Sequence, residues 1–155
     1  MSLRRRSVLT IDTDWSRYAD ELVCSHNYAE EVGNKMPTWI QTADWKSEKH
    51  VPAIEIEKKG DNLFHIHVSV GKEIAHPNTT AHHIKWCDLF ILPEGEKFPV
   101  EIGYCTFDHH GESAQGADTS KMYAEPHALF VFKTEKPGLL MATAYCNIHG
   151  LWKSE

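Results

Sequence analysis

From about residue 50 onward, apolar and polar side chains alternate with the period of two that is typical of β-strands. The alternation is clearest over 63–70, where four apolar side chains share one face and three polar ones the other: Phe64, Ile66, Val68 and Val70 against His65, His67 and Ser69. Further strands are predicted over 51–57, 83–92, 98–107, 128–133 and 139–145. Six or seven short strands separated by Gly, Pro, Asp and Asn turns predict an all-β fold, a seven-stranded antiparallel immunoglobulin-like β-sandwich.

The first forty residues follow a different pattern. Trp15, Tyr18 and Leu22 recur at helical spacing, and Gly33 with Asn34 supplies a stop signal. We therefore expect residues 1–40 to be an extension with a helix, which packs on the main domain or at a subunit contact. Residues 41–155 are expected to form the β-domain.

Composition and charge exclude several classes of function. The 155 residues carry 16 basic and 22 acidic side chains, a net charge of −6, so no basic excess is available for nucleic-acid binding. No apolar run approaches the roughly 20 residues that cross a bilayer. The apolar segment after Arg4, Arg5 and Arg6 is too short for a secretory signal. A cytoplasmic protein that binds neither membranes nor nucleic acids is expected.

Two counts point to metal chemistry, because the chain has 11 histidines and 4 cysteines. Cys24, Cys87, Cys105 and Cys146 form no C-x-x-C pair, and without a secretory signal free or ligating thiols are favoured over disulfides. Cys146 and His149 are three residues apart in a Gly-containing turn and can bind one ion. Loops at strand ends can bring other histidines to the same end of a sandwich. A thiolate with several imidazoles suits iron, copper or zinc.

Three segments carry a resemblance to a known family. They are EKHVP at residues 48–52, HPNTT at 76–80 followed by His82-His83-Ile84, and CNIHGLW at 146–152. PEGxxFP at 93–99 and FxxHGE at 107–112 add to it. Over roughly residues 40–155, in order and spacing, these motifs resemble the superoxide reductases, also called neelaredoxins or one-iron desulfoferrodoxins.

The resemblance implies one mononuclear iron, cycling between Fe(II) and Fe(III), and a set of site residues. The equatorial imidazoles fall on His50, His76, His82 and His149, and the axial thiolate falls on Cys146. Glu48 falls on the sixth ligand of the oxidised form, and Lys49 on the cation that attracts superoxide and holds the developing peroxide. Two-iron members bind a second iron with four N-terminal cysteines, whereas residues 1–40 contain only Cys24. No second iron centre is therefore expected.

The resemblance also implies the reaction and the partners. Superoxide takes up one electron and two protons to give hydrogen peroxide, without release of dioxygen. A one-electron donor such as rubredoxin restores Fe(II), and family members form homo-oligomers, either dimers or tetramers.

Other histidines and cysteines receive plainer interpretations. His65 and His67 form an H-x-H pair like that of copper-zinc superoxide dismutases, but alternation predicts a solvated strand face. His83 points opposite to His82 and is expected to be a hydrogen-bonding partner. His26, His109, His110 and His127 are expected at the surface or behind the ligands, and Cys87 and Cys105 in the core.

Two alternatives stay open from the residues alone. A cupredoxin-like electron carrier also uses Cys and His at the end of a sandwich, but usually with a Met shortly after the last His, and no Met follows His149. A structural zinc module prefers a closed set of four ligands, whereas five candidates are present beside Glu48 and Lys49.

Overall fold

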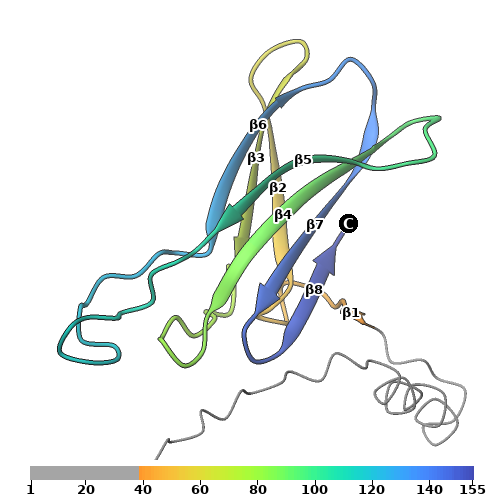
Figure 1. Cartoon of the computed structure of the whole chain (residues 1–155). Helices are drawn as coiled ribbons and strands as arrows, with labels where there is room; N and C mark the ends of the chain where they lie inside the picture. The colour runs from red at the N-terminus through yellow and green to blue at the C-terminus, as the bar shows by residue number, and fades with distance from the viewer. Residues whose placement is uncertain (1–38) are drawn as a thin grey trace, which may run out of the picture. The chain divides into compact units, whose positions relative to one another are not determined.

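Eight β-strands are present in the described part of the chain, residues 39–155 of the computed structural model (Figure 1). They are β1 (Ile40–Gln41), β2 (Pro52–Lys58), β3 (Leu63–Val70), β4 (Ile84–Pro93), β5 (Val100–Thr106), β6 (His127–Lys133), β7 (Gly138–Cys146) and β8 (Gly150–Ser154). Residues 39–155 contain no α-helix. Accordingly, no helix of these residues has the length and apolar character needed to span a bilayer. The helix predicted near the N-terminus lies outside the described residues.

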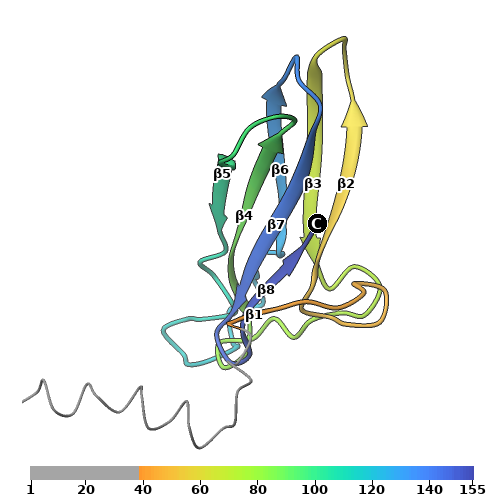
Figure 2. The same ribbon diagram turned by 90° about the vertical axis from the view of Figure 1, so that its right-hand side faces the viewer.

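The strands form two sheets, which Figure 2 shows as two layers. One sheet has the order β1-β8-β7-β4-β5 and the other the order β2-β3-β6. All neighbouring strands are antiparallel except β1 and β8, which pair in parallel. The predicted all-β class is confirmed, and all six strand ranges predicted from alternation correspond to strands.

The prediction of seven antiparallel strands was wrong in two details, since the described residues hold eight strands and one parallel pair. β1 has only two residues, too few for alternation to register. β8 begins at Gly150, directly after His149. Its first residues belong to the CNIHGLW motif, so this segment was interpreted as part of the metal-binding motif and not as a strand.

The core lies between the sheets and consists of the inward-facing residues of strands from both sheets, which alternate along each strand with outward-facing residues. It includes Ile66 and Val68 of β3, Cys87 and Leu89 of β4, and Ala142, Ala144 and Cys146 of β7, all with at most 1% of their surface exposed. Interiors of this kind are close-packed, so truncating Ile66 or Leu89 to Ala would cost about 2–5 kcal/mol. Cys146 is the last residue of this buried row, and its sulfur is therefore shielded by the core.

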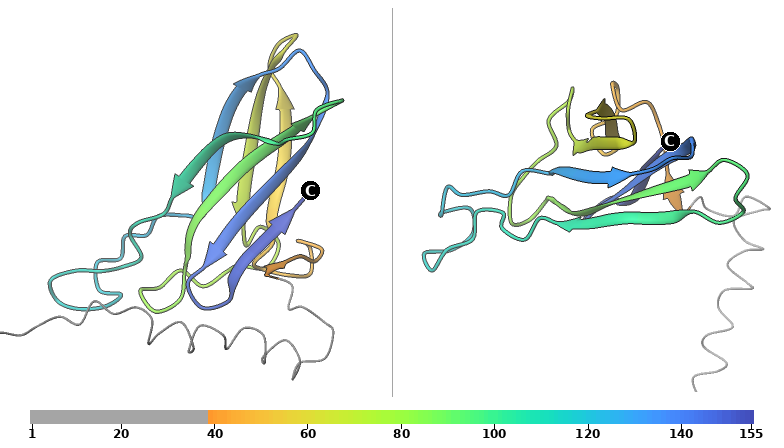
Figure 3. Two further views of the ribbon diagram at one scale, coloured as in Figure 1. Left: turned by 45° about the vertical axis from the view of Figure 1, so that its right-hand side comes forward. Right: turned by 90° about the horizontal axis from the view of Figure 1, so that it is seen from above.

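One end of the sandwich gathers segments that are far apart in sequence. β2 begins, β3 ends, β4 begins and β7 turns into β8 at the lower end of Figure 1 and of the left-hand view in Figure 3. Ile84 pairs with Cys146, and Cys146 pairs in turn with Gly150. This register brings the residues just before β4 next to the end of β7.

Candidate metal centre

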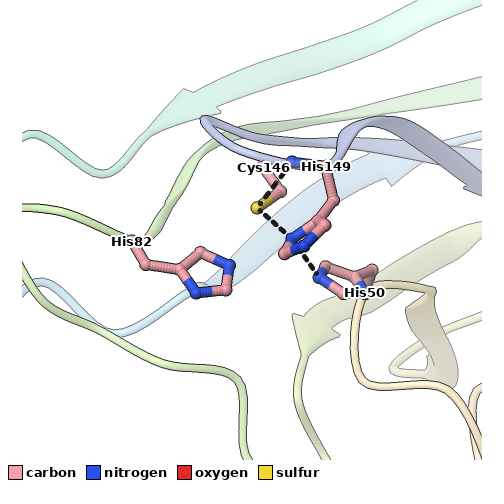
Figure 4. A group of neighbouring side chains, drawn as sticks. All are labelled: His50, His82, Cys146 and His149. Atoms are coloured by element: carbon pink, nitrogen blue, oxygen red, sulfur yellow. Dashed lines mark hydrogen bonds between the residues drawn. The ribbon is translucent and has the colours of Figure 1, made fainter.

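Four side chains with metal-binding atoms converge at this end of the sandwich. One ligand atom from each of His50, His82, Cys146 and His149 lies within 4.8 Å of all the others. Figure 4 shows the four side chains pointing toward one another, with His50 and His82 on separate segments and Cys146 and His149 on one turn. The group extends from fully buried Cys146 to exposed His149, so it is dry on one side and open to solvent on the other.

Cys146 and His149 are held by the turn between β7 and β8. Gly150 closes this turn with φ +76°, a left-handed backbone conformation that glycine adopts without steric cost. The turn brings the His149 Nδ1 to 3.5 Å from the Cys146 Sγ, and the backbone N of His149 to 3.4 Å from the same sulfur. The short turn thus brings a thiol and an imidazole close enough to bind one ion, as the C-x-x-H spacing predicted.

His50 is oriented from both sides just before β2. The Glu48 carboxylate accepts hydrogen bonds from the His50 Nδ1–H at 2.6 Å and from its backbone N–H at 3.2 Å. With Nδ1 used in this way, Nε2 points into the group and lies 3.0 Å from the His149 Nδ1. The His50 ring also stacks on Trp152 at 4.9 Å, and the Trp152 indole N–H donates to the His149 carbonyl at 3.2 Å.

His76 and His82 come from the segment between β3 and β4. The His76 ring lies 4.8 Å from that of His50 and 4.7 Å from that of His82, between centroids. Its Nδ1–H donates to the Pro77 carbonyl at 2.6 Å, which turns Nε2 toward the other rings. Gly71 is required nearby, because a Cβ there would approach the backbone N of His76 to 2.6 Å. His76 therefore borders the group, although its ligand atom falls outside the 4.8 Å set.

Two unpartnered nitrogens test whether these residues suit a metal. The Nε2 atoms of His76 and His82 are buried and have no hydrogen-bond partner among the described residues. A buried polar atom without a partner is costly, and a cation that accepts the lone pair removes the cost. Imidazoles with one thiolate are a donor set that iron accepts. The residues present therefore fit a mononuclear iron.

Burial keeps the imidazoles in the form that binds metal. It lowers the pKa of His76 from 6.5 to about 4, and it lowers the pKa of His82 as well. Burial likewise lowers the pKa of His50, more than the hydrogen bond to Glu48 raises it. Neutral rings offer a lone pair, whereas protonated rings offer none, so these nitrogens are available to a metal at neutral pH.

The predicted acid–base pair lies beside the group. Lys49 is half-buried, and its charge contributes to the lowered pKa values of His50, His76 and His82. Glu48 has its carboxylate on His50; burial acts to raise the pKa of Glu48, but the hydrogen bonds from His50 outweigh it and the pKa falls below 4.5. Glu48 is thus bound to a ring edge that faces away from His149.

A network behind the rings holds the segment that carries His82. The Asn147 side chain accepts from the His83 backbone N–H at 2.9 Å and donates to the Ala81 carbonyl at 2.9 Å. The His83 ring bonds the Thr79 carbonyl at 2.9 Å and stacks on His110 at 3.6 Å. The predicted hydrogen-bonding role of His83 is confirmed. Asn147 and Trp152 belong to the CNIHGLW motif at residues 146–152, but nothing in their spacing indicated these contacts.

The remaining candidates lie apart from the group. Cys87 is a free thiol in the core on β4, as predicted, and burial raises its pKa to about 12. Cys105 on β5 is also a free thiol but is only partly buried and packs against the core. His65 and His67 lie on the polar face of β3, also as predicted. Cys24 and His26 fall outside the described residues.

The sequence has relatives among characterised families. Residues 42–155 match the Desulfoferrodoxin family. The chain is 56% identical over 116 residues to the superoxide reductase of Pyrococcus furiosus, covering 75% of this chain and 93% of that protein. It is 51% identical over 122 residues to the neelaredoxin of Megalodesulfovibrio gigas, covering 77% and 94%. The structure of reduced superoxide reductase (neelaredoxin) from Archaeoglobus fulgidus is similar, with a TM-score of 0.73, 54% identity, and coverage of 75% of this chain and 94% of that one.

Proposed function

Because this chain belongs to the desulfoferrodoxin family, we propose that it is a superoxide reductase that converts superoxide to hydrogen peroxide at a mononuclear iron centre. Its relatives of that name share about half of their residues with it across more than nine-tenths of their length. The observation that carries the proposal is the convergence of the buried Cys146 thiol with the nitrogens of His50, His82 and His149.

The residues proposed to hold the iron are His50, His76, His82 and His149, with Cys146 as the thiolate ligand. When bound, the iron supplies the single electron that reduces superoxide and passes from Fe(II) to Fe(III). The unpartnered Nε2 atoms of His76 and His82 support their inclusion. The core around Cys146 keeps water from the sulfur, and exposed His149 borders the side from which a small anion can enter.

Lys49 is proposed to attract the substrate and to hold the product. The chain has a net charge of −6, which repels an anion, whereas the half-buried Lys49 ammonium near the imidazoles attracts it locally. No hydrogen bond or ion pair with another residue of 39–155 engages this ammonium, so it can donate to an incoming oxygen. Reduction to peroxide consumes two protons, and Lys49 can donate one directly or through a water molecule.

Glu48 is proposed as the sixth ligand of the oxidised form. The carboxylate neighbours the imidazole group but hydrogen-bonds to His50. To act as a ligand it must leave the His50 N–H, and when the iron is reduced it can return. The same contact gives Glu48 a second function, which is to fix the tautomer and orientation of the His50 ring.

Four further parts of the proposal rest on the sequence or on its resemblance to the family. They are a rubredoxin-like one-electron donor, a homo-oligomer of two or four chains, a cytoplasmic location, and an N-terminal extension over residues 1–40 that holds no second iron. Size measurement of the full chain and of a chain lacking residues 1–38 tests whether the extension determines the oligomer.

Metal analysis combined with product analysis tests the function. The purified protein should contain one iron per chain and show a thiolate-to-Fe(III) absorption band when oxidised. Pulses of superoxide given to the reduced protein should yield one peroxide per iron oxidised, with no dioxygen from this step. Stoichiometric zinc or copper, or release of dioxygen in the amount that dismutation requires, would contradict the proposal.

A further inference from the structure

A second pair of imidazoles lies outside the metal centre, on two neighbouring strands of the smaller sheet. The His67 Nδ1 lies 3.0 Å from the His127 Nε2, and the two rings meet edge to face with centroids 5.3 Å apart. His67 is on β3 and His127 is the first residue of β6. Neither residue belongs to the centre around Cys146.

The strand register places an acidic side chain beside this pair. Ser69 is directly opposite His127, so His127 is diagonal to His67 and on the same face of the sheet. On the other side of β3, Glu55 is directly opposite His67. The pKa of Glu55 is lowered, chiefly by a hydrogen bond from Lys72, and His67 and His127 lower it further. The Glu55 carboxylate therefore interacts electrostatically with both imidazoles.

The spacing of the two nitrogens matches that of two ligands on one ion. Metal–nitrogen bonds of about 2.0–2.1 Å, meeting at roughly 90° to 109°, place the nitrogens about 2.8–3.4 Å apart. The observed 3.0 Å lies inside this interval. A hydrogen bond has the same length, so in the metal-free pair one nitrogen carries the proton that a metal would replace.

We propose that His67 and His127 form a second metal site, on the outer face of the smaller sheet, for a borderline divalent cation such as Cu²⁺, Ni²⁺ or Zn²⁺. Glu55 is the third ligand, and it supplies the carboxylate after releasing Lys72, with which it pairs at 2.5 Å. Water completes the coordination, since Glu55 and His127 are exposed. This inference does not depend on the proposed superoxide chemistry.

Metal binding here requires a change of tautomer but no net loss of a proton. In the neutral pair each ring has one N–H, and one of the two facing nitrogens carries the proton that forms the hydrogen bond between the rings. When the ion binds both facing nitrogens, that proton moves to the far nitrogen of its own ring, which reaches solvent. Imidazole ligands without a thiolate favour copper, nickel and zinc over Fe²⁺, so this site would not compete for the iron.

The probe is Ni²⁺, added to the iron-loaded full-length protein and followed by calorimetry, with Cu²⁺ and nitrogen hyperfine structure in electron paramagnetic resonance as a second readout. One equivalent should bind without loss of iron. His67→Gln and His127→Gln should each weaken binding by more than about tenfold, the lower end of the loss caused by removing an outer-shell partner. Ni²⁺ should also raise the melting temperature of the parent protein, because it joins β3 to β6.

His65→Gln is the matched control, since His65 lies two residues from His67 on the same face of β3. It should leave Ni²⁺ binding unchanged. Binding that survives both His67→Gln and His127→Gln would overturn the proposal, as would the absence of any bound equivalent. Loss of binding in His65→Gln with retention in His127→Gln would also overturn it, because the ion would then be held along one strand. Near-ultraviolet circular dichroism and iron content verify that each variant is folded.

Discussion

The Cys146 sulfur and the His149 ring face each other across a three-residue turn, with Sγ 3.5 Å from Nδ1. Their environments are opposite, since Cys146 is fully buried and His149 is exposed. A metal between them would have a dry side at the sulfur and a wet side at the imidazole. This asymmetry gives an anion one direction of approach and keeps it away from the thiolate.

Replacing Cys146 by serine tests the thiolate ligand. Because a hydroxyl is a poor ligand for iron at neutral pH, Cys146→Ser should lose the thiolate-to-Fe(III) absorption band and the reduction of superoxide. Absorption spectra of the oxidised protein and pulse radiolysis measure the two losses. Cys105→Ser is the control, because Cys105 is also a free thiol but lies on β5. A variant at Cys146 that kept both the band and the reaction would exclude it as a ligand.

Lys49 should control how fast superoxide arrives. Lys49→Ala removes the ammonium beside the imidazoles, so the second-order rate constant should fall by about tenfold, and its decrease with added salt should become shallower. Iron content should not change. Lys46→Ala removes an equal charge from the preceding turn, where the ammonium lies over the Trp45 ring, and should have a much smaller effect. Equal rate losses in the two variants would point to net charge and against a local action of Lys49.

Glu48 should influence the oxidised state more than the reduced one. Glu48→Ala should leave the rate of superoxide reduction largely intact but shift the ferric absorption band, because a candidate ligand is lost. It should also weaken iron binding by about 10–100-fold, since the His50 N–H loses its acceptor. Exposed Glu73 serves as the control site. An unchanged ferric spectrum together with weaker iron binding would leave Glu48 only as the partner of His50.

Alternation alone was sufficient to predict most of the fold. The pattern over 63–70 corresponds to β3 residue for residue, because each strand of a two-layer sandwich has one face in the core. β1 and β8 escaped prediction for a physical reason. Ile40–Gln41 is defined by its parallel pairing with Leu151 and Trp152, a long-range contact with no local signature.

The site was predicted in part from spacing and in larger part from resemblance. The Cys146–His149 turn is a local feature, and its geometry follows from the two intervening residues and from Gly150. The approach of His50 to His149 joins residues 99 positions apart, which no spacing in the sequence encodes. The hydrogen bonds between the Asn147 side chain and the segment that carries His82 were missed for the same reason, because the partners of Asn147 depend on how β4 pairs with β7.

Asp88 should lower the stability of the protein at neutral pH. It lies on β4 between Tyr104 of β5 and Thr143 of β7, and its Oδ1 is buried without a hydrogen-bond partner among the described residues. Burial raises the pKa of Asp88, and the charge of Glu101 raises it further. Below the unfolded-state pKa both states hold the proton and no penalty exists. As the pH rises, the unfolded state loses its proton first and is favoured, until the full penalty is reached above the folded-state pKa.

Asp88→Asn removes the charge while keeping the shape of the side chain. The free energy of unfolding should therefore rise by roughly 1 kcal/mol at pH 8, the scale on which optimising a single charge commonly stabilises a protein. The gain should shrink as the pH falls through the range in which Asp88 takes up its proton. Urea unfolding of the iron-loaded protein at pH 8 and at mildly acid pH measures both values, with Asp61→Asn in the exposed turn before β3 as the control for formal charge. A variant that is no more stable than the parent at pH 8 would show that the Asp88 carboxylate is adequately solvated on the sheet.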